Sequence, residues 1–137
     1  MTYYLGSTSN SDEFLLLKNN KKIEFSLNTK SIPGTKKFFN SNYLNVVNPD
    51  NTIYNIEQDI ELFMYQSYPE YHLRSNIIFN NKQFVQFKVE DDLVVNPNTN
   101  LSINIEIDKI KFNHENKFYS VVLRVTSVSI KYFQKTY

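Results

Sequence analysis

The alternation of apolar and polar side chains predicts a chain built mainly from β-strands. Apolar and polar positions alternate strictly over residues 22–28, and a period of two is typical of a half-buried strand. A short apolar run at residues 14–17 predicts a preceding strand, with a turn at residues 19–21 between the two. Residues 43–47 predict a further strand. Between these strands, residues 32–39 contain Pro33-Gly34 and are predicted to be a loop that exposes basic and aromatic side chains.

The period changes in the middle of the chain, where residues 49–67 predict a helix. Asn48 is suited to the N-cap, Pro49 to the first helical position and Asp50 to the first turn. The apolar residues that recur at helical spacing are Ile53, Ile56, Ile60, Phe63 and Met64. Pro69 disfavours helix at the residue before it. A strand interpretation stays open, because several apolar residues also fall on even positions.

The second half of the chain is strand-like throughout. The apolar runs 77–79 and 84–89 flank an Asn-Asn-Lys turn and predict a hairpin. After a loop at residues 96–100, apolar and polar residues alternate again from Leu101. A turn at residues 113–116 then leads into one long apolar strand, or a pair of strands, up to residue 133. These last segments are predicted to form one long β-hairpin.

This order of elements predicts a mainly β fold in a single domain covering residues 1–137, with an ordered core at about 12–133. A small OB-like β-barrel fits best, with one helix (about 49–67) between strands three and four. A β-sandwich or jelly roll is the alternative. The plan resembles that of the single-stranded-DNA-binding proteins of phages, viruses and linear plasmids, which use OB barrels. The resemblance covers topology only, so no family residues are carried over.

The composition points to an AT-rich gene. Asn, Lys, Ile, Phe and Tyr supply 65 of the 137 residues, while Ala is absent and Arg occurs twice. A virus, a phage, a selfish plasmid, or a compositionally biased parasite or symbiont would have such a gene, and we carry the virus or mobile element forward as the expectation. Single Asn and Lys residues therefore carry less functional weight than they would in an average protein.

Several classes of protein are disfavoured. The chain has no cysteine, which excludes disulfides and cysteine-based zinc sites. Its start lacks the pattern of a signal peptide, and no apolar run approaches the roughly 20 residues that cross a bilayer. We therefore expect an intracellular protein of the host cytoplasm or nucleus, or of a virion, with no membrane partner. The net charge of +1 gives no global preference for polyanions.

We predict a non-enzymatic protein that has no cofactor and no bound metal. The two histidines, His72 and His114, are isolated in sequence, and two glycines are too few for a phosphate-binding loop. The carboxylates Glu106 and Asp108 lie near Lys109, so a metal-dependent nuclease remains an alternative function. We prefer to interpret them as the polar face of an alternating strand, and the acidic cluster at residues 90–92 as a solvated strand end.

Grouped lysines with neighbouring aromatic residues are the best candidate for a binding surface. Proteins that bind single strands combine lysines for the phosphates with aromatic rings on which bases stack. The candidate contact residues are Lys36, Lys37, Phe38, Phe39, Lys109, Lys111, Phe112 and Tyr119. Single-stranded nucleic acid is thus the leading partner, with self-association also expected. The alternatives are a structural virion or assembly subunit, and a small adaptor or inhibitor that binds a host protein.

Overall fold

The computed structural model describes residues 2–38, 41–47, 51–80, 82–89, 100–130 and 133–136. These residues form one helix, α1 (Thr52–Tyr65), and eleven strands: β1 (Tyr3–Ser7), β2 (Glu13–Lys18), β3 (Lys21–Lys22), β4 (Glu24–Phe38), β5 (Ser41–Val47), β6 (His72–Arg74), β7 (Ile77–Asn80), β8 (Lys82–Val89), β9 (Asn100–Asn113), β10 (Phe118–Ile130) and β11 (Phe133–Thr136). For parts of β4, β5, β7, β8 and β11 the description extends to the backbone only.

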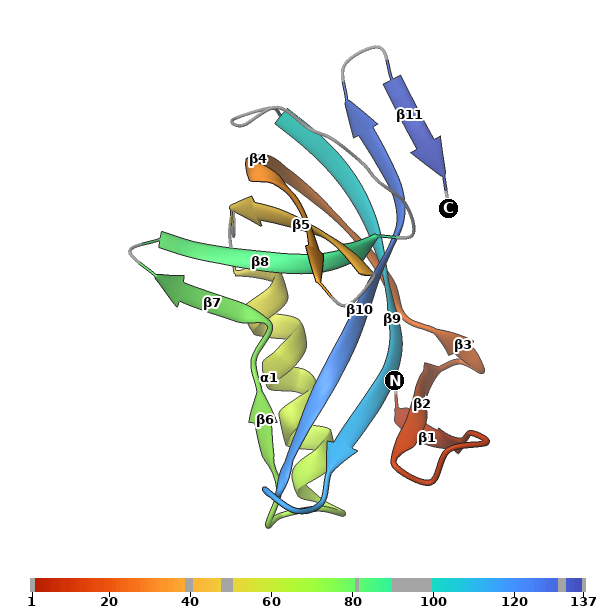
Figure 1. Cartoon of the computed structure of the whole chain (residues 1–137). Helices are drawn as coiled ribbons and strands as arrows, with labels where there is room; N and C mark the ends of the chain where they lie inside the picture. The colour runs from red at the N-terminus through yellow and green to blue at the C-terminus, as the bar shows by residue number, and fades with distance from the viewer. Residues whose placement is uncertain are drawn as a thin grey trace.

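All of these strands belong to one strongly curled sheet, and α1 lies on its concave side (Figure 1). Strand β9 pairs with β4, β4 with β5, and β5 with β8. Strand β8 meets β10 in parallel through one residue pair, Arg124↔Lys88, and β10 pairs back onto β9. The pairings therefore run in a five-strand circuit that is narrowly joined between β8 and β10, which gives the sheet the form of a half-barrel.

Two irregularities in the β9–β10 hairpin allow these long strands to curve. The register shifts between Val122 and Leu123, and again between Val125 and Ser127. At the first shift β9 has one extra residue, Asp108, so the inward side chains change from odd to even positions and Ile110 is buried like Ile107. Such β-bulges bend the strand and increase its twist, which wraps the sheet around the helix.

The helix closes the core with a stripe of apolar residues. Ile53, Ile60 and Met64 are buried in the same cluster as the inward side chains of β9 and β10. Burying a side chain of this size contributes roughly 1.5–3 kcal/mol. Phe63 reaches the first strand, where its ring lies 5.7 Å from that of Tyr3.

One buried carboxylate ties the helix to the chain that follows it. Glu57 accepts hydrogen bonds from the Ser75 hydroxyl (2.6 Å) and from the backbone N–H of Asn76 (2.9 Å). The Asn76 side-chain amide in turn donates to the carbonyl of Val121 in β10 (2.8 Å). Glu57 therefore fixes the bend between β6 and β7 against both α1 and the sheet, and its donors offset the cost of burying the carboxylate.

The structure confirms most of the predicted strands and turns. The strands at 14–17 and 43–47 are present, as are the 77–89 hairpin and the long hairpin that begins at Leu101. The turn between β2 and β3 has Asn19 at φ 55° and Asn20 at φ 62°, as a two-residue hairpin turn with two left-handed residues requires. The predicted loop at 96–100 lies outside the described residues except for Asn100.

Two expectations about the order of elements were wrong. Residues 32–38 belong to strand β4 and not to a loop, because the register shift between Ser31 and Thr35 absorbs Pro33-Gly34 as a bulge. The helix follows five strands and not three, since β1 and β3 also pair. Within the five-strand circuit, α1 lies between the second and third strands.

The helix itself lies inside the predicted range, but its N-terminus differs. Asn51 is the N-cap, it makes no side-chain capping bond, and the first turn contains no acid. The proposed cap at residues 48–50 lies outside the described residues. In the described part of the chain, no helix is long and apolar enough to cross a membrane.

We predict that Glu57→Gln lowers the free energy of unfolding by about 1–3 kcal/mol, because the amide that replaces one carboxylate oxygen cannot accept from Ser75 or Asn76. Urea denaturation monitored by circular dichroism measures the change. Glu61→Gln, on the exposed side of the same helix, is the matched control and is expected to change stability by less than about 0.5 kcal/mol. Equal effects in the two variants would contradict the structural role of Glu57.

Candidate functional site

A hollow of about 530 Å³ lies at the closed end of the β9–β10 hairpin. Its lining comes from β6, β9, β10, the turn that joins the hairpin and the chain just before β2. The residues are Asp12, Arg74, Lys111, Phe112, Asn113, His114, Glu115, Phe118 and Ser120. This size is within the range of small-molecule sites, which is about 300–1,000 Å³.

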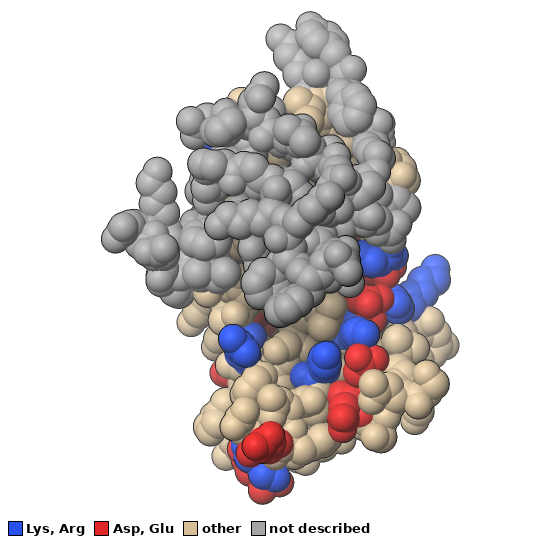
Figure 2. Space-filling view, in the orientation of Figure 1, with Lys and Arg blue, Asp and Glu red and all other residues tan. Residues whose placement is uncertain are grey.

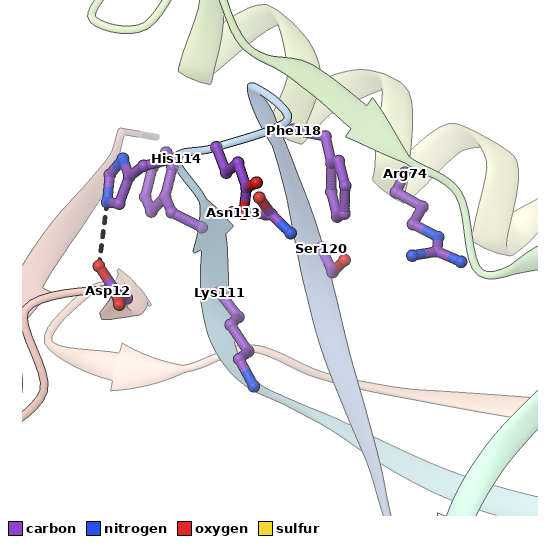
Figure 3. A pocket seen from close by; sticks show the side chains of 9 residues that line it. Asp12, Arg74, Lys111, Asn113, His114, Phe118 and Ser120 are labelled. Carbon is purple, nitrogen blue, oxygen red and sulfur yellow. Dashed lines mark ion pairs between the residues drawn. The ribbon is translucent and has the colours of Figure 1, made fainter.

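Strand pairing places three of these residues in a row across the outer face of the sheet. Ser120 in β10 is paired with Lys111 of β9 on one side and with Arg74 of β6 on the other. Lys111 and Arg74 therefore flank the Ser120 hydroxyl, as Figure 3 shows. The inward neighbours Ile110, Tyr119 and Val121 are buried in the core, so the alternation along each strand keeps the row on the solvent side.

An aromatic ring adjoins this row. Phe118 lies two residues before Ser120 on the same face of β10 and is half-buried. The Arg74 guanidinium lies 5.3 Å from the centroid of the Phe118 ring, which is within the range of a cation–π contact. The hollow thus combines two cations, a hydroxyl and a ring.

The end of the hollow away from Arg74 carries Asp12 and a histidine (Figure 3). His114 Nε2 lies 3.1 Å from Asp12 Oδ1, and its Nδ1 lies 2.6 Å from the Tyr71 hydroxyl. The imidazole also stacks on Phe112, with ring centroids 5.6 Å apart and planes 3° from parallel. His114 is exposed in the turn, as expected, but it is not isolated. These contacts fasten the turn to the start of β2 and to the segment after α1.

Other charges on this face are already paired, and Figure 2 shows blue and red side chains side by side there. Lys109 pairs with Glu13 at 3.0 Å, and Lys22 with Asp108 at 2.9 Å. Glu106 pairs with Arg124 at 3.0 Å. In the described part of the chain Lys111 has no such partner, and Arg74 contacts the Phe118 ring. Among the residues that line the hollow, these two are the cationic side chains without a carboxylate partner.

Two of the predicted contact residues are aromatic rings that the structure buries in the core. Phe112 is 4% exposed and Tyr119 is 1% exposed. Phe112 lies at the centre of a cluster of rings, 4.9 Å from Tyr68 and 5.3 Å from Tyr71. Rings that are buried in this way cannot stack on a base without opening the core, so neither remains a candidate contact. They belong to the core because they fall on the inward positions of β9 and β10.

The predicted lysines divide into three groups. Lys111 lines the hollow, and Lys109, two residues earlier, pairs with Glu13. For Lys36 and Lys37, as for Phe38, only the backbone of β4 is described, and Phe39 lies outside the described residues. The prediction for residues 36–39 therefore stays a prediction.

Arg74, Phe118 and Ser120 were not among the predicted site residues. The two β10 residues could have been found, since odd–even alternation and the hairpin register together place them beside Lys111. Arg74 carried no such signal, because its position depends on the parallel pairing of β6 with β10, which joins residues far apart in the chain.

Glu106 and Asp108, the carboxylates considered for a metal-dependent nuclease, form ion pairs with other side chains. Glu106 and Asp108 both lie within 4 Å of Lys22, at 3.7 and 2.9 Å. No group of three His, Asp or Glu side chains that could hold a metal ion is found among the described residues. The acidic cluster at residues 90–92 lies outside them.

Comparisons of the chain with protein-family models, with curated proteins and with solved structures found no match.

Tyr119 gives the protein a predicted sensitivity to alkali. Burial, and to a smaller extent the negative charges of Glu61 and Glu57, raise the pKa of its hydroxyl to about 12 from the ordinary 10.0. Between pH 10 and 12 the unfolded chain therefore loses a proton that the folded chain keeps, so the free energy of unfolding falls as the pH rises. The loss reaches roughly 2–3 kcal/mol at pH 12.

Urea denaturation at pH 9, 10 and 11 measures this slope, and Tyr119→Phe is expected to flatten it. The control is Tyr54→Phe, on the exposed side of α1, which is expected to keep the wild-type slope. A Tyr119→Phe protein that loses stability with pH as steeply as the wild type would show that this hydroxyl is not responsible.

Proposed function

We propose that this chain is a non-enzymatic protein that binds single-stranded nucleic acid and supports replication of a virus, a phage or another AT-rich mobile element. The observation that carries the proposal is the Lys111–Ser120–Arg74 row beside the Phe118 ring. A groove that binds single strands needs cations for the phosphates and an aromatic surface for the bases. The hollow offers both, on a sheet face where the neighbouring charges pair with one another.

The fold supports the same proposal. The five-strand circuit with its narrow β8–β10 join has the size and the partly open closure of an OB-type barrel, a fold that binds oligonucleotides. The position of α1 between the second and third strands departs from the expected plan. We therefore describe the barrel as OB-like and base the function on the site.

The lysine and aromatic residues at 36–39 are a second part of the proposed surface. Their strand, β4, pairs with β5 as a hairpin whose last pair is Phe38↔Ser41. Loops and hairpin ends on an OB-type barrel border its binding face. A strand that follows the outer face could contact both the hairpin end and the hollow.

We predict that the protein binds an oligo-dT strand with an affinity that falls at least about fivefold when salt rises from about 50 to about 200 mM. Two phosphate contacts, at Lys111 and Arg74, give a slope near −1.4 on a log–log plot for a single strand, and this slope corresponds to about sevenfold over that range. Fluorescence anisotropy with a labelled strand measures both quantities.

Lys111→Gln is expected to reduce the steepness of the salt slope by about 0.7, the value for one phosphate contact to a single strand. Lys21→Gln, an exposed lysine in β3 that does not line the hollow, provides the matched control. The double variant Lys36→Ala, Lys37→Ala tests the second part of the surface. No binding at low salt, or binding that neither Lys111→Gln nor the Lys36→Ala, Lys37→Ala double variant changes, would refute the proposed function.

A structural or assembly subunit is the second candidate, and an exposed apolar stripe on α1 favours it. Leu62 and Tyr65 are 71% and 67% exposed, and Tyr54, two turns earlier, is 52% exposed. Large apolar side chains grouped on one helix face are typical of contact surfaces between proteins. The partner in this case would be a second copy of the chain.

Under this second function, the protein forms an oligomer without nucleic acid, and Leu62→Lys shifts it toward the monomer. Size-exclusion chromatography with light scattering measures the mass at several concentrations. Gln66→Lys introduces the same charge just beyond the helix and serves as the control. A wild-type protein that stays monomeric at high concentration would exclude this candidate.

A further inference from the structure

We propose that the hollow holds one nucleotide of the bound strand, with its phosphate at the Lys111–Ser120–Arg74 row and a base that bears an amino group at the opposite end. This inference rests on the proposed function and specifies which unit of the strand the site binds. It follows from the division of the hollow into a basic end and an acidic end.

The basic end has the donors that a phosphate needs. Lys111 and Arg74 belong to the strands on either side of β10, so their backbones are roughly 10 Å apart at two strand spacings. Both side chains are long enough to converge on a group above Ser120, and Figure 3 shows them on either side of it. An ammonium, a guanidinium and a hydroxyl then surround one phosphate, and charge-assisted hydrogen bonds of this kind are the stronger ones.

A base fits beside the phosphate because the ring of Phe118 is two residues away on the same strand. The Arg74 guanidinium already lies against this ring, 5.3 Å from its centroid. A base that packs against Phe118 therefore stays next to the cation that holds its phosphate. Stacking on an aromatic side chain is a contact that every base can make.

The acidic end favours a base with an amino group. Asp12 lies at this end beside His114, Glu115 also lines the hollow, and their carboxylates can only accept hydrogen bonds when ionised. Asn113 Oδ1 accepts from the backbone N–H of Asn116 at 2.9 Å, which leaves the Asn113 amide N–H groups as donors. Cytosine, adenine and guanine each present an amino donor beside a ring-nitrogen acceptor and match this arrangement, whereas thymine has no amino group and its 4-carbonyl would face the carboxylates.

The test is a titration of the full chain with single nucleotides, followed by NMR of the backbone amides. The probes are dCMP, dTMP and deoxycytidine, which differ in the base or in the phosphate alone. We expect the shifts to concentrate at residues 111–120 and 74. We also expect dCMP to bind at least fivefold more tightly than dTMP and at least tenfold more tightly than deoxycytidine.

Two variants test which residues bind the phosphate and which residues select the base. Lys111→Gln is expected to weaken dCMP at least fivefold and to leave deoxycytidine unchanged. Glu115→Gln, an exposed residue of the turn, is expected to narrow the preference for dCMP over dTMP to less than twofold. Lys21→Gln is the control and should leave all three probes unchanged. Both functional variants change exposed residues, and circular dichroism verifies that each remains folded.

Titrations with oligo-dT and with oligo-dC separate failure of this inference from failure of the proposed function, because the hollow is expected to disfavour thymine. If either strand binds but dCMP produces no shifts at the hollow, or if dCMP and dTMP bind equally, the nucleotide site is wrong and strand binding stands. If dCMP binds and no strand does, the proposed function fails, together with the statement that the hollow holds a unit of a strand. Strand binding with the expected nucleotide and variant pattern supports both.

Discussion

The pairing of β9 with β10 is the constraint on which the rest of the structure depends. Strand β9 also pairs with β2 and β4, and β10 also pairs with β6, β8 and β11. The two bulges in this hairpin curve both strands, and the curvature creates the concave surface that α1 fills. The same hairpin has its inner positions in the core and its outer positions in the hollow. A single register therefore determines both the packing and the candidate site.

The hollow owes its charge to selective pairing among its neighbours. Lys109 and Lys22 neutralise carboxylates on the outer face of the sheet, and each such pair contributes little to stability in solvent. Lys111 lies one pleat beyond Lys109 and escapes this pairing, while Arg74 contributes a second cation from β6. This arrangement lets a protein with a net charge of +1 present a local basic surface without a field over the whole molecule. The proposed nucleotide site depends on that local difference.

Two polar clusters hold the segments that border the hollow. Glu57 fixes the β6–β7 bend, just after Arg74, to the helix and to β10. His114, between Tyr71 and Asp12, fastens the hairpin turn to the segment after α1 and to the start of β2. The elements that contribute Arg74, Lys111 and Phe118 are thus connected to the core on both sides. Rigid support of this kind lowers the conformational entropy that a ligand would otherwise cost.

The sequence by itself determined the local elements of this protein. Short apolar segments between turn residues placed β2, β5, β7, β8 and β10, period-two alternation placed the start of β4 and β9, and helical spacing placed α1, because burial on one face sets the local pattern of apolar residues. Lys111 was predicted as a contact residue because lysines and aromatic residues are grouped around it, and the structure places it in the lining of the hollow. Pro33-Gly34 misled the prediction, since a bulge inside a strand uses the same residues as a turn.

Only the tertiary structure decided which side chains meet. Phe112 and Tyr119 looked like exposed rings next to lysines, yet the bulge at Asp108 and the packing of rings from β2 and the post-helix segment put them in the core. Arg74 joined Lys111 and Ser120 through the parallel pairing of β6 with β10, a contact across more than forty residues of chain. Strands that are so far apart in the sequence pair only when the whole sheet closes, so no local pattern of residues predicts which strands will pair.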